Sequence, residues 1–324
     1  MMNPRAMPTR SLAEGALLAA IAVLLALAGI YLPLIGFLAA LTWPVPVLLA
    51  QLRHGMRLSL LVVAVTGLLL AGTIGLIPAL GLVFTLGPLG VVLGEAFRRG
   101  ASPGLTLAAA SGAALLSNLL SLAMTLLVVG QNPIHLYRTA FDEGLELSAR
   151  LYARMGMDVT AIIGPMREQM ELLLGILFPF TLAMAALTLA GLNYGLAVLV
   201  LRRLGHPISA FPPFASWRLP RQSWLVLPLG IGLRYIDGAQ PGLASAAGSN
   251  LMLAGQFAFL VSGLAVIYWW LGRFRLNRLA KVAAVAYVFV VPLLSGLAML
   301  VGLIDTALDW RKLRPAGNVG GGKT

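Results

Sequence analysis

The sequence predicts an all-α protein, a polytopic bundle of transmembrane helices with about nine spans. Of its 324 residues, 59% are hydrophobic and only 10% are charged, whereas a soluble domain carries about 25% charged residues. The charges are separated by long apolar runs, each holding the roughly 20 residues that a helix needs to cross a bilayer. These runs also lack the two-residue alternation that a membrane β-barrel requires.

The first two apolar runs are too long to be one helix each. Residues 15–52 and 58–94 each contain about 37 residues without an acidic or basic side chain other than histidine. A helix of that length would reach roughly 55 Å, against a hydrocarbon core of about 30 Å. We place the breaks at 31–33 and 72–78, where Pro and Gly interrupt a helix. The predicted spans are 15–31, 34–51, 58–74, 79–97, 103–129, 172–201, 223–237, 249–271 and 282–304.

Basic residues predict how these spans are oriented. Arginines recur after every second crossing in the first half of the chain, whereas the loop 131–171 carries four Arg against six acidic residues. Since cytoplasmic loops are enriched in Lys and Arg, we predict a cytoplasmic N-terminus and an extracytoplasmic 131–171 segment. The net charge of +12 is spread over short loops, so we expect no nucleic acid as a partner.

The basic loops leave the span count open between eight and nine. Nine crossings place the tail outside, although the basic residues at 311–314 favour the inside. The short segment 223–237 can instead be re-entrant. Eight crossings then bring the tail inside but leave the basic loop 273–281 outside, so neither count suits every loop. We adopt nine.

Two regions outside the spans have a recognisable pattern. Residues 131–171 place Leu, Tyr, Phe and Met at helical spacing among mixed charges, which predicts one or two amphipathic helices divided at Gly164-Pro165. They form either a solvated hairpin or a cap over a cavity. The loop 202–222 is rich in Pro and aromatic residues. It either docks a cytoplasmic partner or lies along the lipid headgroups.

No pattern in the sequence indicates catalysis. The chain has no cysteine, and His54, His135 and His206 are too scattered to form a zinc motif. The Gly-rich tail 315–324, which we expect to be flexible, matches the P-loop pattern only in its letters, because no helix follows it. We expect neither an enzyme nor a bound metal or cofactor.

Uncharged polar side chains at membrane depth are the candidates for function, because hydrocarbon penalises them. Ser111, Asn118, Ser121 and Thr125 fall on one face of the fifth predicted helix. Such groups either bind a small polar solute or hold helices together, and both readings stay open. The candidate substrate-binding residues are Asn118, Ser121, Thr125, Asn193, Tyr194, Asn250 and Gln256.

Two acidic residues near span ends have arginines one helical turn away. Glu95 lies three and four residues before Arg98 and Arg99, and Arg234 lies three residues before Asp237. Residues at these separations face each other on a helix. We therefore predict local ion pairs at both places, with Glu95 as a paired interfacial acid rather than a proton carrier.

Several short segments carry a resemblance to a known family. They are Trp43-Pro44-Val45-Pro46, Arg53-His54-Gly55, Gly263-Leu264-Ala265-Val266, Gly302-Leu303-Ile304-Asp305 and Asp309-Trp310-Arg311-Lys312. With them, the chain resembles the YybS-like bacterial membrane proteins, a family of unknown function, over roughly residues 12–314. The ending around Asp305 and Arg311 is its most specific part. The chain departs from the family at Ser262, where we would expect Gln.

Through its first six helices, this family is remotely similar to the substrate-binding S components of energy-coupling-factor vitamin transporters. The resemblance implies an S-component-like six-helix core at 1–201, which contains the 131–171 insert, and C-terminal membrane helices at 223–314 that S components lack. It implies a location in the bacterial inner (cytoplasmic) membrane. Ala16-x-x-x-Ala20 would match the small-residue motif through which S components meet a transmembrane coupling subunit, which works with ATPases.

Two hypotheses follow. The first is a substrate-binding and transport subunit for a small, polar, vitamin-like solute, energised by separate partners. Its site would lie between the 32–36 loop, the fifth and sixth helices and the 131–171 cap. The second is a non-transporting membrane scaffold or regulator, which recruits partners through the loop 202–222 and the basic tail.

Overall fold

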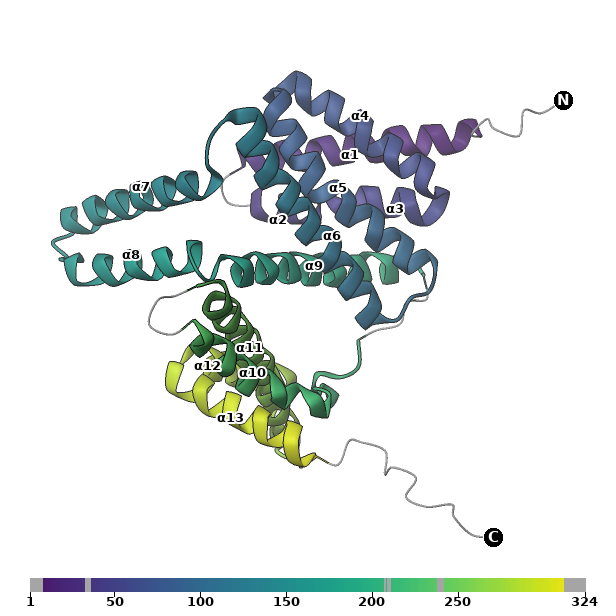
Figure 1. The fold of residues 1–324 in the computed structure, drawn as a ribbon. Helices are drawn as coiled ribbons and strands as arrows, with labels where there is room; N and C mark the ends of the chain where they lie inside the picture. Colours follow the sequence, from purple (N-terminus) through teal and green to yellow (C-terminus); the bar gives the residue numbers. More distant parts are fainter. Residues whose placement is uncertain (1–7, 33–35, 207, 209–210, 238–241, 312–324) are drawn as a thin grey trace, which may run out of the picture. The chain divides into compact units, whose positions relative to one another are not determined.

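The computed structural model describes residues 8–32, 36–206, 208, 211–237 and 242–311. Every regular element in this part of the chain is helical (Figure 1), which confirms the all-α class. The chain divides into two units, which are described separately. Unit 1 is Met1–Leu174 with Thr181–Ala210, and unit 2 is Gly175–Phe180 with Phe211–Thr324.

Six helices in the described ranges are long and apolar enough to cross a membrane. They are α1 (Thr9–Tyr31), α4 (Met56–Ile74), α5 (Leu76–Arg98), α6 (Pro103–Met124, with the turn that follows it), α9 (Phe178–Arg203) and α11 (Leu243–Leu271). A seventh candidate is the pair α12 (Arg278–Val290) and α13 (Pro292–Leu308), which is bent by 103°. The described residues thus hold six to seven candidate spans, and the count of nine stays a prediction.

Three predicted spans are short or broken in the structure. The predicted span 34–51 consists of α2 (Gly36–Thr42) and α3 (Pro44–His54), and 282–304 is divided between α12 and α13. The third, 223–237, contains the end of a 3-10 turn and the short helix α10 (Val226–Ile236). In each case of a break, a proline begins the second helix, since it cannot donate a backbone hydrogen bond to the preceding turn. The predicted break within 72–78 is confirmed at Gly75. Part of the other predicted break, 31–33, lies outside the described residues.

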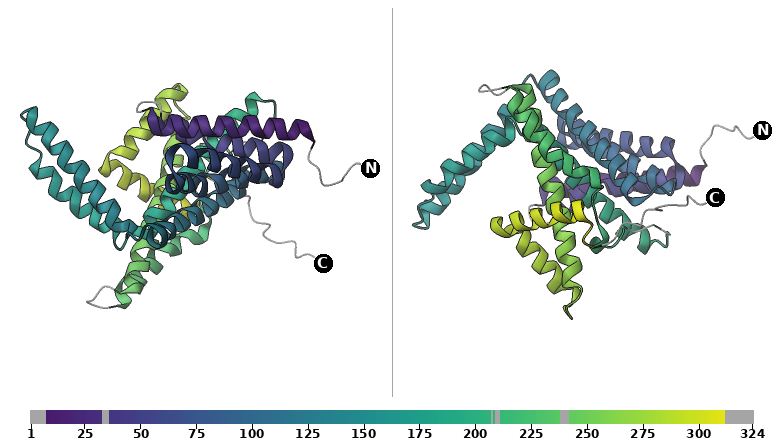
Figure 2. Two further views of the ribbon diagram at one scale, coloured as in Figure 1. Left: turned by 90° about the horizontal axis from the view of Figure 1, so that it is seen from above. Right: turned by 60° about the horizontal axis from the view of Figure 1, so that its bottom comes forward.

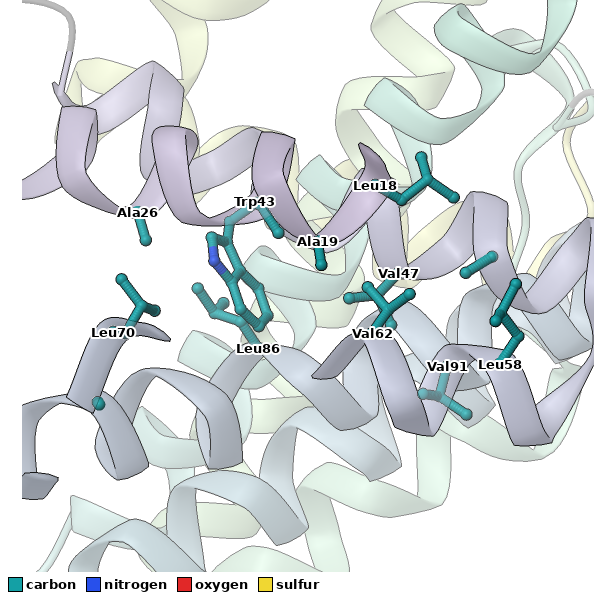
Figure 3. Close-up of a cluster of buried hydrophobic side chains, with 13 residues drawn as sticks. Leu18, Ala19, Ala26, Trp43, Val47, Leu58, Val62, Leu70, Leu86 and Val91 are labelled. Atoms are coloured by element: carbon teal, nitrogen blue, oxygen red, sulfur yellow. The ribbon is translucent and has the colours of Figure 1, made fainter. Parts of the chain in front are cut away.

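The core of unit 1 lies between α1, α3, α4 and α5. Trp43 is fully buried there, with its indole ring beside Leu70 and Leu86 (Figure 3). Helix α5 approaches α3 closely at Gly94, where a Cβ atom would lie 2.6 Å from the Cβ of Gln51. Small residues are a common means of close helix approach in membranes.

The segment between α6 and α9 forms two amphipathic helices that pack side by side (Figure 2). After α6 come a π-helix, η1 (Thr125–Val129), then α7 (Pro133–Arg154) and α8 (Thr160–Leu174). The prediction of helices here is confirmed, but their division at Gly164-Pro165 is wrong. The chain turns at Gly156, which has a φ of 76°, and the N–H of Met157 bonds to the carbonyl of Tyr152. A glycine in this left-handed conformation terminates helices, whereas Pro165 is accommodated within α8.

Unit 2 is built around α11, which packs against α10 and α13. Unit 2 also contains α12 and the two short 3-10 turns η2 (Phe214–Ser216) and η3 (Arg221–Leu225). Helices α11 and α13 cross at Gly263 and Gly302. A Cβ on Gly263 would overlap the carbonyl oxygen of Ala298, and one on Gly302 would overlap that of Phe259. The two backbones therefore touch at this crossing.

Candidate functional site

Uncharged polar side chains are buried in the spanning helices of unit 1. Thr66 on α4 and Ser111 and Ser117 on α6 have buried hydroxyl oxygens, for which the described part of the chain supplies no hydrogen-bond partner. Asn118, beside Ser117, is half-buried. An unpaired polar group in apolar surroundings costs about 1–3 kcal/mol. These hydroxyl groups are therefore unused hydrogen-bonding positions at membrane depth.

Asn193, on α9, is buried with half of its amide unsatisfied. Its side chain donates from Nδ2 to the carbonyl of Leu189, one turn earlier, at 3.0 Å. Its Oδ1 has no partner among the described residues, although the residue is only 1% exposed. The neighbouring Tyr194 is buried as well, and its ring stacks on Phe97 of α5 with 5.5 Å between the centroids. Helix α9 thus holds an unpaired amide oxygen next to an anchored tyrosine.

Ser121 and Thr125 line a shallow pocket between the end of α6 and the first turns of α5. Its apolar wall includes Leu80, Phe84 and Met124. The hydroxyl of Thr125, where the π-helix begins, donates to the carbonyl of Ser121 at 3.0 Å. The pocket has a volume of about 60 Å³, whereas small-molecule sites typically occupy roughly 300–1,000 Å³. The structure brings two predicted residues to one pocket, which in this conformation holds only a few water molecules.

Asn250 and Gln256 lie on α11, in unit 2. The Nδ2 of Asn250 donates to the carbonyls of Ile176 and Ala246, at 2.7 and 2.8 Å. Its Oδ1 accepts from the backbone N–H of Phe180 at 2.9 Å. Asn250 therefore ties the chain just before and at the start of α9 to α11. Gln256 is half-buried, and a solute-binding role for either residue stays a prediction.

Ala16 and Ala20 lie on the exposed face of α1. Helix α1 packs into the core of unit 1 through other residues, Leu18, Ala19 and Ala22. The predicted stripe is thus on the face of α1 that is turned away from that core. Its role in binding a partner stays a prediction.

A polar network at the end of α5 includes a residue that the sequence analysis missed. Glu95 pairs with Arg98 and Arg99, at 2.7 and 2.6 Å, which confirms that prediction. The fully buried Gln51 of α3 donates to Glu95 at 2.7 Å and accepts from the hydroxyl of Ser59 on α4. This amide links three helices. The only signal in the sequence was a glutamine close to basic residues at the end of an apolar run.

Two further carboxylates are also satisfied within their unit. Glu14 on α1 forms an ion pair with Arg53 and, at 2.9 Å, a hydrogen bond with Nε2 of His54. Asp237 accepts a hydrogen bond from the backbone N–H of Ser245 at 2.8 Å, at the start of α11. The predicted pair with the preceding arginine, at position 234, is not among the ion pairs of the described residues. The N-terminus of α11, with its unpaired N–H groups, binds the Asp237 carboxylate in place of the arginine side chain.

In unit 2, a buried arginine joins the end of α13 to the loop before α10. Arg311 donates from Nε and Nη2 to Oδ2 of Asp305, at 3.1 and 2.8 Å. It also donates from Nη1 to the carbonyl of Ala215 and from Nη2 to that of Trp217, both at 2.7 Å. Asp309, in a left-handed turn, brings the chain back for these contacts. We call this arrangement the Arg311 clamp. The sequence analysis identified Asp305 and Arg311 as the most specific part of the family resemblance. It did not reveal that Arg311 binds Asp305 and the backbone of the loop before α10.

Groups suited to metal binding are dispersed. Within the described ranges, no three His, Asp or Glu side chains lie close enough together to hold a metal ion. The absence of an enzymatic activity and of a cofactor stays a prediction.

Comparison with known proteins places this arrangement of helices among membrane proteins. A family described as "Predicted membrane protein (DUF2232)" matches residues 20–306. The chain is also 27% identical over 311 residues to the "Uncharacterized protein YybS" of Bacillus subtilis (strain 168), which covers 94% of this chain and 98% of the relative. No solved structure matches the chain. The resemblance to the YybS-like bacterial membrane proteins is thereby confirmed, whereas the likeness to S components stays a prediction.

Proposed function

The chain belongs to the DUF2232 family of predicted membrane proteins, and from this premise we propose that it is a substrate-binding and transport subunit for a small polar solute. The solute would bind among the spanning helices of unit 1, near Asn118, Ser121, Thr125, Asn193 and Tyr194. Separate partner subunits would supply the energy, with the exposed Ala16 and Ala20 as the contact with a coupling subunit.

One observation carries the proposal. The amide oxygen of Asn193 and the hydroxyl groups of Ser111, Ser117 and Thr66 are buried without partners in the described part of unit 1. Groups that serve only as helix glue are expected to be paired across helices, as Asn250 is. Unpaired groups at membrane depth are what a polar solute would satisfy on binding.

The small pocket beside Ser121 and Thr125 implies that binding involves a change of conformation. A volume of about 60 Å³ does not hold a vitamin-sized molecule, so the solute would stabilise a more open state. A ligand shifts such an equilibrium only by its difference in affinity for the two states. The change of conformation would occur at the π-helix that begins at Thr125, because such distortions often mark functional sites.

The contacts of the loop before α10 support this function over that of a scaffold. Phe214 packs against Tyr268 of α11, with 5.7 Å between ring centroids, and against Trp217, at 5.3 Å. The Arg311 clamp uses two backbone carbonyls of the same loop. Aromatic side chains that are engaged within unit 2 leave less of this loop for recruiting a partner.

Thermal unfolding of the purified protein with a panel of vitamins and polar metabolites tests the proposal. We expect one member to raise the melting temperature by about 5 °C at 100 times its Kd. Asn193→Leu should abolish this shift, whereas Gln131→Leu, which replaces an exposed amide before α7, should retain it. No shift with any member, together with unchanged uptake of the panel in a deletion strain, would refute the proposal.

A further inference from the structure

One end of unit 2 combines an apolar pocket with a cationic rim, and we propose that it binds an anionic phospholipid. An acyl chain would occupy the pocket, and the phosphate would lie against the arginines that follow α11. This site is separate from the solute site proposed for unit 1 and does not depend on it.

The pocket is formed where α11 and α13 end. Its walls include Val266, Trp269 and Trp270 of α11, together with Val301 and Trp310. Its volume is about 220 Å³. The one charged group in its lining, Arg311, is already engaged by Asp305 and two carbonyls. The pocket therefore suits a stretch of hydrocarbon chain rather than a polar solute.

The rim of the pocket is cationic. The guanidinium group of Arg273 lies 4.6 Å from the ring centroid of Trp269, which lines the pocket. Arg273, Arg275 and Arg278 are exposed, and no ion pair joins them to a carboxylate in the described part of the chain. Basic residues beside a membrane helix attract anionic headgroups. The positive charge of the rim thus favours a lipid with an anionic headgroup.

The exposed tryptophans of the pocket favour a position where lipid headgroups meet hydrocarbon. Trp270 and Trp310 are 50% and 66% exposed, and tryptophan is enriched at membrane interfaces. The loop that contacts this end, through Phe214 on Tyr268 and through the Arg311 clamp, is itself basic and rich in prolines. By the positive-inside rule, this end faces the cytoplasmic leaflet.

The chain's own C-terminal residues are poor competitors for the site. The sequence after Arg311 contains Lys312, Arg314 and Lys323 but no acidic side chain. A segment of the same sign as the rim is repelled by it. An anionic lipid can fill the pocket with an acyl chain and pair its phosphate with the arginines of the rim.

Quenching of tryptophan fluorescence by brominated lipids tests the proposal on the full-length protein in nanodiscs. We expect brominated phosphatidylglycerol to quench at a much lower mole fraction than brominated phosphatidylcholine. Each arginine that contacts the headgroup contributes about fivefold to the affinity for an anionic lipid. The double variant Arg273→Gln with Arg275→Gln should therefore weaken the preference for phosphatidylglycerol over phosphatidylcholine about 25-fold. Arg57→Gln, an exposed arginine at the start of α4, is the matched control and should leave it unchanged.

Two further measurements test where the lipid binds. Val301→Phe narrows the pocket without changing charge, and we expect it to reduce quenching by phosphatidylglycerol. Inorganic phosphate at matched ionic strength should not displace the lipid. Equal quenching by both lipids, an equal loss in the Arg57 variant, full quenching in the Val301 variant, or displacement by phosphate would each overturn the proposal.

Discussion

Arg311 is enclosed at the end of α13, where it satisfies one carboxylate and two backbone carbonyls. Arg311→Met would leave Asp305 buried without a counter-charge, and losing one partner of a buried ion pair costs about 3–5 kcal/mol. We expect this loss of stability in thermal unfolding in detergent. Arg311→Lys should also destabilise the protein, because one ammonium group cannot make all the hydrogen bonds of the planar guanidinium group.

The control for this prediction is Arg275→Met, because Arg275 is exposed on the same unit. Its stability should lie within about 0.5 kcal/mol of the parent protein. Equal stability of the Arg311 and Arg275 variants would show that the clamp contributes nothing to the fold.

The buried Asn193 and the half-buried Asn250 differ in the use of their amides. Asn250 makes three hydrogen bonds, two of them to the segment that leads into α9. Asn193 bonds only within its own helix. Since interhelical hydrogen bonds in membranes average about 0.6 kcal/mol, Asn250→Leu should cost about 1–2 kcal/mol. Asn193→Leu should cost less than about 0.5 kcal/mol. Unfolding of both variants in parallel checks this, and the reverse order would contradict it.

At the scale of helices, unit 2 depends on the contact between the backbones of α11 and α13. Gly302→Ala would place a methyl group on the carbonyl of Phe259, so the helices would have to separate. We expect a loss of about 3 kcal/mol or more. Gly296→Ala, on the same helix, meets nothing within 4 Å and should be neutral or slightly stabilising. Thermal unfolding of the two variants distinguishes them, and similar midpoints would contradict the close crossing.

The bent pair α12–α13 begins and ends at the same end of unit 2. Its start follows the last turns of α11, where Tyr268 contacts Phe214, and its end is held by the Arg311 clamp to the same loop. The 103° bend lies at Pro292. Because both ends lie together, we predict that the pair is a re-entrant element rather than a crossing. This prediction puts the loop 202–222, the loop 273–281 and the start of the tail on one side of the membrane.

At the scale of the whole molecule, this arrangement predicts a membrane topology that suits every basic loop. The chain has no cysteine, so single cysteines at Ser216, Asn277 and Lys323 can report sidedness. We expect all three to react with a membrane-impermeant maleimide only after the cells are permeabilised, whereas Ser148→Cys in α7 should react in intact cells. Labelling of position 323 in intact cells would favour nine crossings instead, whereas labelling of position 277 would favour a re-entrant segment at 223–237.

The sequence predicted much of the helical structure and part of the candidate site. The break at Gly75, the ion pairs of Glu95 and the helices within 131–171 were each predicted from neighbours within a few residues. Gln51 and the clamp were missed, because their partners are distant in the chain: Glu95 is 44 residues from Gln51, and Ala215 is 96 residues from Arg311. The turn at Gly156 was missed because Gly164-Pro165 carries the stronger break signal in the sequence, whereas α8 continues through Pro165.

Hydropathy and charge spacing act locally, so the sequence by itself determined that this is a helical membrane protein and which segments are apolar enough to span. The use of each polar side chain was decided only by the tertiary structure. Asn193 and Asn250 are the same residue type in similar helices, yet one keeps an unpaired oxygen and the other is fully bonded. The physical reason is that hydrogen bonds and backbone contacts depend on which distant segments meet, and packing alone brings those segments together.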